Sequence, residues 1–183
     1  MQRFNIVLIV TLVLVLLVAS PVAAKKPLTT LTMDEIATQP IDGLSFSGVT
    51  FAFTVNGMPS TDANYHAYGP GQMEFVQDPS IEGTIYGTLV MVFDKPTTEV
   101  AFGVALETMY DVEDAVIVKL YRPGAGLLRE TVDLDGHPVI LWTEAQYTYS
   151  GPAVKTVEIT FQPAFGASRF ALDNLVFHKH PQS

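Results

Sequence analysis

From residue 44 onward, apolar and polar residues alternate with a period of two, and the apolar ones are mainly β-branched or aromatic. Because successive side chains of a strand point to opposite faces, this period predicts half-buried strands. Short groups of Gly, Pro, Asp and Asn separate the segments, as expected for turns. We predict strands at Leu44–Val55, Met73–Val76, Gly87–Asp94, Glu99–Leu106, Ala115–Tyr121, Leu127–Leu134, Val139–Tyr149, Lys155–Phe161 and Arg169–Phe177.

The predicted strands recur at a spacing of about eight to twelve residues, and no long helical pattern lies between them. This arrangement predicts an all-β fold, an antiparallel β-sandwich of the jelly-roll type. Two turns support it, at Asp94-Lys95-Pro96 and at Asp135-Gly136. The one helical signal, Thr32 followed by Glu35, has the spacing of a capping box, although an entry strand fits this segment equally well.

The first 24 residues differ from the rest of the chain. Arg3 is followed by an apolar run and then by the small residues Val22-Ala23-Ala24, which predicts a signal peptide cleaved before Lys25. The run is shorter than the roughly 20 residues that a membrane-spanning helix needs, which disfavours the alternative of an uncleaved anchor. We expect a loose tail at 25–30, one sandwich domain at 31–178 and a C-terminal tail at 179–183. The protein is then secreted, or periplasmic if its host has a second membrane.

Composition narrows the classes of function. The chain has a net charge of −9, and loss of the signal segment leaves 159 residues with a net charge of −10. This charge repels phosphate backbones and anionic membrane surfaces, so we expect no nucleic-acid or membrane partner after cleavage. There is no cysteine, which excludes disulfides, cysteine nucleophiles and cysteine-based metal sites. We find no motif of a serine, zinc or nucleotide hydrolase.

Asp173 interrupts Phe170–Phe177, the most apolar stretch of the mature chain. A carboxylate in a strand of this kind must be paired, hydrogen-bonded or bound to a metal. Two interpretations remain open, a metal ligand or a bulge at Asp173-Asn174 whose side chains face solvent or cap neighbouring backbone groups. A second set of acids, on the loop after residue 106, suits either calcium or a solvated surface; it comprises Glu107, Asp111, Glu113 and Asp114.

A second candidate site lies in or near the polar segment 56–87, where Tyr65, Tyr68 and Tyr86 are found. Tyrosine rings can cover the apolar faces of sugars, while side chains such as Asn64 and His66 hydrogen-bond to the hydroxyls. These five residues are therefore our candidate ligand-binding set. The alternative is that the rings close one end of the sandwich and leave their hydroxyls in water.

Five segments together resemble uncharacterised secreted single-domain proteins of microbes. These segments are Gly48–Phe53, Asp78–Gly83, Gly87–Phe93, Tyr147–Pro152 and Phe170–Leu175. More remotely, Ala171–Leu175 resembles the last strand of jelly-roll carbohydrate-binding modules and of MAM-type adhesion domains. In those families this aspartate commonly helps to hold a structural calcium, with an acidic residue near the start of the domain as its partner. The resemblance implies calcium at Asp173, with Asp34 or Glu35 as partner.

Together these observations predict a secreted, non-catalytic β-sandwich module that binds a glycan or a cell-surface polymer, with a structural calcium. One alternative is a structural or adhesive extracellular protein that contacts other proteins. A less favoured alternative is a glycan-active enzyme, which needs two carboxylates facing each other across a cleft. The pattern carries no information on oligomeric state.

Overall fold

The computed structural model describes residues 27–124, 126–136, 141–163 and 166–178. All regular elements in these ranges are β-strands. The described residues contain no helix that is long and apolar enough to cross a membrane. The predicted signal segment and the tail at 179–183 lie outside the described residues. The strands are β1 (Leu28–Leu31), β2 (Gln39–Pro40), β3 (Ser45–Phe46), β4 (Val49–Val55), β5 (Met58–Pro59), β6 (Asn64–Ala67), β7 (Ser80–Thr84), β8 (Gly87–Leu106), β9 (Val112–Tyr121), β10 (Leu127–Gly136), β11 (Thr143–Phe161) and β12 (Arg169–His178).

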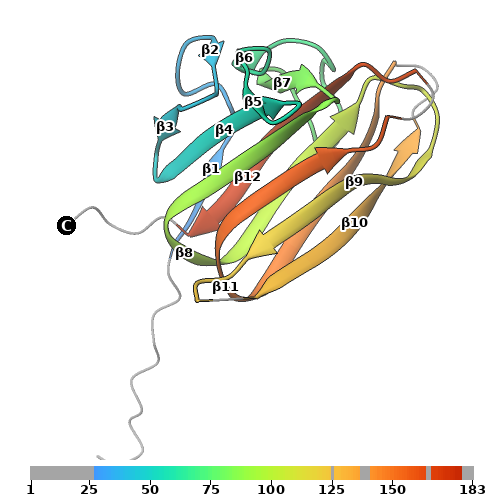
Figure 1. The fold of residues 1–183 in the computed structure, drawn as a ribbon. Coiled ribbons are helices and arrows are strands. Elements are labelled where there is room, and N and C mark those ends of the chain that lie inside the picture. The colour runs from blue at the N-terminus through green and yellow to red at the C-terminus, as the bar shows by residue number, and fades with distance from the viewer. Residues whose placement is uncertain (1–26, 125, 137–140, 164–165, 179–183) are drawn as a thin grey trace, which may run out of the picture.

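The strands pair antiparallel and form two facing layers (Figure 1). The β9 layer consists of β4, the first half of β8, the second half of β11, and then β9 and β10. The β12 layer consists of the second half of β8, the first half of β11, and β12 with β1, β7, β6 and β2. The predicted all-β, antiparallel jelly-roll sandwich is confirmed.

The long strands β8 and β11 each pass through both layers, because they bend at a shared corner. The turn predicted at Asp94-Lys95-Pro96 is the exposed bend of β8, where the strand changes layers without ending. Lys155 holds this corner by donating from Nζ to the carbonyls of Phe93 and Asp94. Each of these strands was predicted as two, because the bend interrupts the alternating pattern as a turn does.

Other predicted boundaries also differ from the structure. Residues 28–30, expected in the loose tail, form part of β1 and pair with the end of β12. The predicted strand Leu44–Val55 is the hairpin β3–β4, because Ser47 and Gly48 have positive φ values of 51° and 97°. Met73–Val76 is a bend in a loop. Asp135-Gly136, predicted as a turn, lies within β10 and pairs with β11. Residues 137–140 of the predicted strand Val139–Tyr149 lie outside the described residues.

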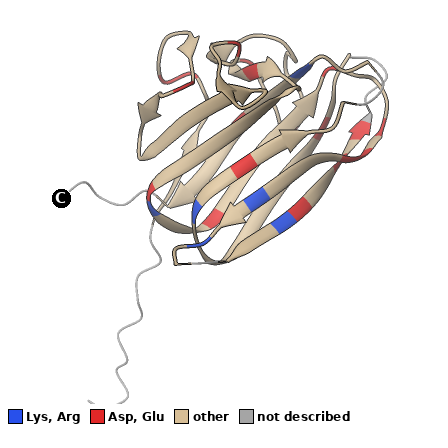
Figure 2. Ribbon diagram, viewed as in Figure 1, with Lys and Arg blue, Asp and Glu red and all other residues tan. Residues whose placement is uncertain are grey.

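On the outer surface of the β9 layer, half-exposed side chains form rows across the strands. One row runs from Ala52 through Val90 and Glu158 to Lys119 and Arg129. Figure 2 shows charged residues on β11, β9 and β10, one strand after another. No described segment packs over these positions, so this surface is open to solvent.

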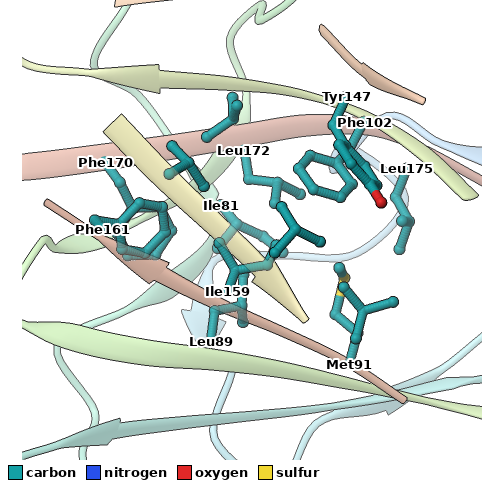
Figure 3. Close-up of a cluster of buried hydrophobic side chains, with 14 of the residues drawn as sticks. Ile81, Leu89, Met91, Phe102, Tyr147, Ile159, Phe161, Phe170, Leu172 and Leu175 are labelled. Atoms are coloured by element: carbon teal, nitrogen blue, oxygen red, sulfur yellow. The ribbon is translucent and has the colours of Figure 1, made fainter. Parts of the chain in front are cut away.

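The core lies between the layers and is rich in aromatic side chains (Figure 3). Phe161 stacks on Phe170 with ring centroids 4.2 Å apart, and Phe53 approaches the same Phe170 ring at 5.8 Å. Phe102 packs against Tyr147 at 5.0 Å. Offset and tilted aromatic pairs of this kind stabilise a core beyond the area they bury, so the sandwich is held without disulfides.

Candidate functional site

The outer surface of the β12 layer is covered by the loop 68–79, which we call the covering loop. It lies directly on Gly103 of β8, where an added Cβ would be 1.9 Å from the carbonyl oxygen of Phe75. Beside this contact, Met73 and Val76 pack with Trp142 against the small side chains of Ala105 and Ala171. Small residues on β8 and β12 thus let a loop lie flat on the sheet.

Glu144 of β11 fixes the middle of the covering loop. Its carboxylate accepts three backbone N–H bonds, from Glu74 at 2.8 Å, Phe75 at 2.8 Å and Val76 at 3.0 Å. Glu144 is itself buried. A buried carboxylate with three charge-assisted bonds is well compensated, so this acid has a structural role.

Asp173 of β12 holds the next residue of the same loop. Its Oδ2 accepts the N–H of Gln77 at 3.1 Å and the side-chain N–H of Asn174 at 3.0 Å. The β12–β8 register shifts directly after Asp173, and Asn174 has a positive φ of 54°. The predicted bulge that caps backbone groups is therefore present.

The other oxygen of Asp173, Oδ1, is buried and has no hydrogen-bond partner in the described chain. Burial raises the pKa of Asp173 from 3.8 to about 6, although the bonds from Asn174 and Gln77 oppose the rise. The carboxylates of Glu35 and Asp34 raise the pKa of Asp173 further. The three acids named as calcium ligands are therefore within electrostatic range of one another.

Asp34 and Glu35 lie in the irregular segment between β1 and β2. Glu35 accepts the N–H of Thr32 at 2.8 Å, and Asp34 accepts the Thr32 hydroxyl at 2.7 Å. The predicted capping-box bond thus forms, but no helix follows it. Among the described residues, no group of three or more acidic or histidine side chains is arranged to hold a metal. Any cation at Asp173 would therefore need Oδ1 together with other oxygen donors.

The structure separates the tyrosines that were predicted to form one platform. Tyr65 is fully buried in the core and donates its hydroxyl to Glu35, so it offers no ring face to a ligand. Burial raises the pKa of Tyr65 strongly, and the bond to Glu35 adds to the rise. Tyr65 was misassigned because its apolar contacts, with Phe46 and Phe51, come from distant strands.

Tyr68 and Tyr86 are exposed, with 68% and 63% of their surface accessible. The β6–β7 ladder pairs Asn64 with Glu82, so Tyr68 follows one end of the ladder and Tyr86 follows the other. At about 3.3 Å per residue the two rings are on the order of 20 Å apart along the strand direction. His66 lies with Tyr68, its Nε2 being 2.8 Å from the tyrosine hydroxyl, whereas Asn64 bonds locally to the Asp62 carbonyl.

A third buried acid, Glu82 of β7, was not found from the sequence. It pairs with the half-exposed Arg169 at 3.2 Å, while its Oε1 is buried without a partner beneath Gly69. Burial raises the pKa of Glu82, and Arg169 partly opposes the rise. Together with Glu144 and Asp173, it forms a row of carboxylates under the covering loop.

The open surface of the β9 layer carries a different polar group. Glu158 of β11 accepts a bond from Lys119 at 2.6 Å and from the Tyr121 hydroxyl at 3.0 Å, both on β9. The hydrogen bond that Lys119 donates to Glu158 raises the pKa of Lys119, so the lysine stays charged. Tyr121 is 36% exposed and lies beside this ion pair. The sequence shows each residue but not that neighbouring strands bring them together.

One end of the sandwich carries exposed apolar side chains. Met109, Tyr110 and Leu141 line a cavity of about 310 Å³ together with Glu107. Glu107 accepts the hydroxyl of Ser168, so it joins two loops at this end. Of the predicted loop acids, Glu107 lies at this apolar surface, whereas Glu113 and Asp114 belong to β9. No metal cluster is found among the described residues.

Comparison with known proteins identifies the fold. No family model and no curated protein matches the sequence. The K1 cleaved adhesin domain of Lys-gingipain from Porphyromonas gingivalis is similar in structure, with a TM-score of 0.53, 12% identity and coverage of 84% of this chain and 99% of that one. A family 29 carbohydrate-binding module gives a TM-score of 0.46 at 10% identity over 84% and 89% of the two chains. A mutant family 29 module complexed with cellulohexaose gives a TM-score of 0.46 at 10% identity over 84% of this chain and 92% of that one. The adhesin domain confirms, for the fold, the predicted resemblance to jelly-roll binding and adhesion modules.

Proposed function

We propose that the protein is a secreted, non-catalytic module that binds a glycan on the open surface of the β9 layer. The observation that carries this proposal is the group formed by Tyr121, Lys119 and Glu158, which is exposed on a five-strand surface that no described segment covers. The signal peptide predicted from the sequence supports the extracellular setting. The structural similarity to an adhesin domain supports a binding role.

The chemistry of this group suits a sugar. Each sugar hydroxyl donates and accepts hydrogen bonds, and the group offers a carboxylate acceptor beside an ammonium donor. Charged partners make stronger hydrogen bonds than neutral ones, yet here the charges compensate each other, so a neutral ligand need not bring a counter-charge. The ring of Tyr121 adds an apolar surface next to these groups.

A non-catalytic role is supported by how the buried acids are used. Glu144 and Asp173 point their carboxylates at backbone N–H groups of the covering loop. A glycosidase needs two carboxylates that face a sugar across a cleft, one of them free to donate a proton. Acids that hold a loop in place are not available for that chemistry.

We also propose a structural calcium at Asp173. Oxygen donors suit this hard cation, and Oδ1 of Asp173 is a buried carboxylate oxygen without a partner. Asp34 and Glu35 add negative charge close to it. A cation there would compensate the buried charge and tie the segment after β1 to β12. Stability should then rise with added calcium, because the ion binds only the folded chain.

The experiment is a glycan array probed with residues 25–183, which contain every strand, in calcium and in chelator. Binding of a defined glycan supports the proposal, and no binding in either buffer contradicts it. Tyr121→Ala should weaken binding of that glycan by about tenfold or more. Tyr68→Ala is the control, because it removes an even more exposed ring that follows β6, in the β12 layer. Thermal unfolding with calcium or chelator tests the cation separately, and an unchanged Tm contradicts it.

The apolar surface around Met109, Tyr110 and Leu141 favours a second candidate function, adhesion to another protein. A double variant, Tyr110→Ser with Leu141→Ser, should abolish binding to the partner protein while glycan binding persists. If the array is negative and this variant changes cell adhesion, adhesion replaces glycan binding as the function.

A further inference from the structure

The β10 strand has an edge that is only partly paired. Asp135 and Gly136 pair with Glu144 and Thr143 of β11, but β11 then leaves β10 to join the β12 layer. From Leu127 to Leu134, β10 pairs with β9 on one side and with no described strand on the other. This leaves an eight-residue edge, which is an attachment site for another strand.

The hydrogen-bond pattern of the β9–β10 hairpin shows which residues of β10 point their backbone N–H and C=O groups toward the unpaired edge. The Arg122 N–H donates to the carbonyl of Gly126 next to the turn. Because hydrogen-bonded and non-hydrogen-bonded pairs alternate in an antiparallel ladder, residues 128, 130 and 132 direct their backbone groups to β9. Arg129, Thr131 and Asp133 therefore direct their N–H and C=O groups to the free edge.

There is space beside this edge. A groove of about 700 Å³ separates residues 129–133 of β10 from residues 146–148 of β11. At its base the Tyr147 hydroxyl donates to Glu130 at 2.5 Å, which ties the two strands where they have parted. The odd-numbered side chains of β10 are exposed, and those of Val132 and Leu134 are buried. The edge is thus accessible, and its pairing with β9 is regular from Leu127 to Val132, where the register shifts.

Charge along the edge selects a partner. Arg129 forms no ion pair within the described chain, and Asp133 uses only Oδ1, which accepts the Asp114 N–H at 2.7 Å. Two antiparallel β10 strands related by a two-fold axis can place Thr131 of one copy opposite Thr131 of the other. Arg129 of each copy then lies opposite Asp133 of the other copy, which gives two ion pairs. Neighbouring registers centred on residues 129, 130 or 133 instead oppose two arginines, two glutamates or two aspartates, and like charges directly opposite destabilise a pair.

We propose that the protein forms a two-fold dimer in which β10 of one copy pairs antiparallel with β10 of a second copy, centred on Thr131. The interface is self-complementary, as a two-fold contact requires. It joins the two β9 layers into one continuous sheet, so two copies of the open surface face the same side. A polymeric ligand could then engage both copies, which raises avidity without a new contact. The dimer itself does not depend on glycan binding.

Analytical ultracentrifugation of residues 25–183, from low micromolar to near-millimolar concentration, tests the dimer. The expected result is a mass that approaches two chains as concentration rises. Thr131→Pro removes a backbone N–H donor from the edge and leaves the pairing with β9 intact. Arg129→Asp places an aspartate opposite Asp133 of the second copy. Each variant should weaken dimerisation at least tenfold. Arg129→Asp with Asp133→Arg should restore it. Lys95→Asp, the same change of charge at the exposed β8 bend, should leave it unchanged.

Hydrogen exchange gives a second measurement. It uses the unmodified protein, so a variant that fails to fold cannot account for the result. Amides of residues 129, 131 and 133 should become slower to exchange as concentration rises, while those of 128, 130 and 132 stay equally protected at all concentrations. A monomeric mass throughout the range overturns the proposal. So does a dimer whose mass and edge exchange are unaffected by Thr131→Pro and Arg129→Asp.

Discussion

Replacing Asp173 with Asn tests whether the buried carboxylate under the covering loop is a burden on the fold in the absence of a cation. A pKa raised from 3.8 to about 6 corresponds to a cost to the folded state of about 3 kcal/mol at neutral pH. The Asn oxygen can still accept the Gln77 N–H, and the neutral amide removes the buried charge. The variant should therefore gain stability at pH 7, by up to about 3 kcal/mol.

The pH dependence has a definite sign. The folded-state pKa lies above the unfolded one, so the folded protein binds more protons between these two values. Wild-type stability should thus fall as pH rises from about 4 to about 6 and stay at the lower level above that range, as far as Asp173 contributes. Glu82 also has a raised pKa and acts in the same direction, so only the difference between wild type and variant isolates Asp173.

The assay is urea unfolding of both proteins at several pH values between 4 and 8, in chelator. The stability difference should grow from small near pH 4 to its maximum above pH 6, and the slope with urea should not change. Added calcium should stabilise wild type and not the variant. A variant that is less stable than wild type at pH 7, or a difference that is the same at every pH, would refute the reasoning.

Three further predictions concern packing. Gly103→Ala should destabilise the fold by about 2 kcal/mol in urea unfolding, because the new Cβ meets the Phe75 carbonyl, and proteolysis should cut the covering loop faster. Glu144→Ala should cost about 3 kcal/mol, because three backbone N–H groups lose their acceptor, whereas the exposed Glu113→Ala should change little. Phe170→Ala should cost about 3 to 5 kcal/mol, measured as a lower Tm, because it leaves a cavity beside Phe161 and Phe53.

The long strands were predictable because each buries one face, which imposes a period of two on the sequence. The prediction was wrong where distant contacts override that local period. Met73–Val76 was predicted to be a strand because its apolar residues looked half-buried. In the structure Met73 and Val76 are buried because they pack on Ala105 and Ala171 of the sheet. The bend of β8 near Pro96 read as a chain reversal, because nothing local reveals that Lys155 fixes a corner there.

The candidate site was predictable only in part, for a related reason. Asp173 was identified because a charge stands out in an apolar run, and the structure gives it buried partners. Glu144 was missed, because an acid in an alternating segment looks like a solvent-facing residue. Lys119 and Glu158 were missed because their pairing depends on strand order, which a single sequence does not contain.

The two outer surfaces of the sandwich differ for a reason that can be read from their residues. On the β12 layer, Gly103, Ala105 and Ala171 leave room above the sheet, and Glu144 accepts loop N–H groups, so a loop covers this surface. On the β9 layer, threonine and valine side chains and the Lys119–Glu158 ion pair occupy the surface, and no described loop lies on it. A ligand of the size of a glycan chain therefore finds only the β9 layer open among the described sheet surfaces. Pairing at the β10 edge would enlarge that open surface and leave the covered one unchanged.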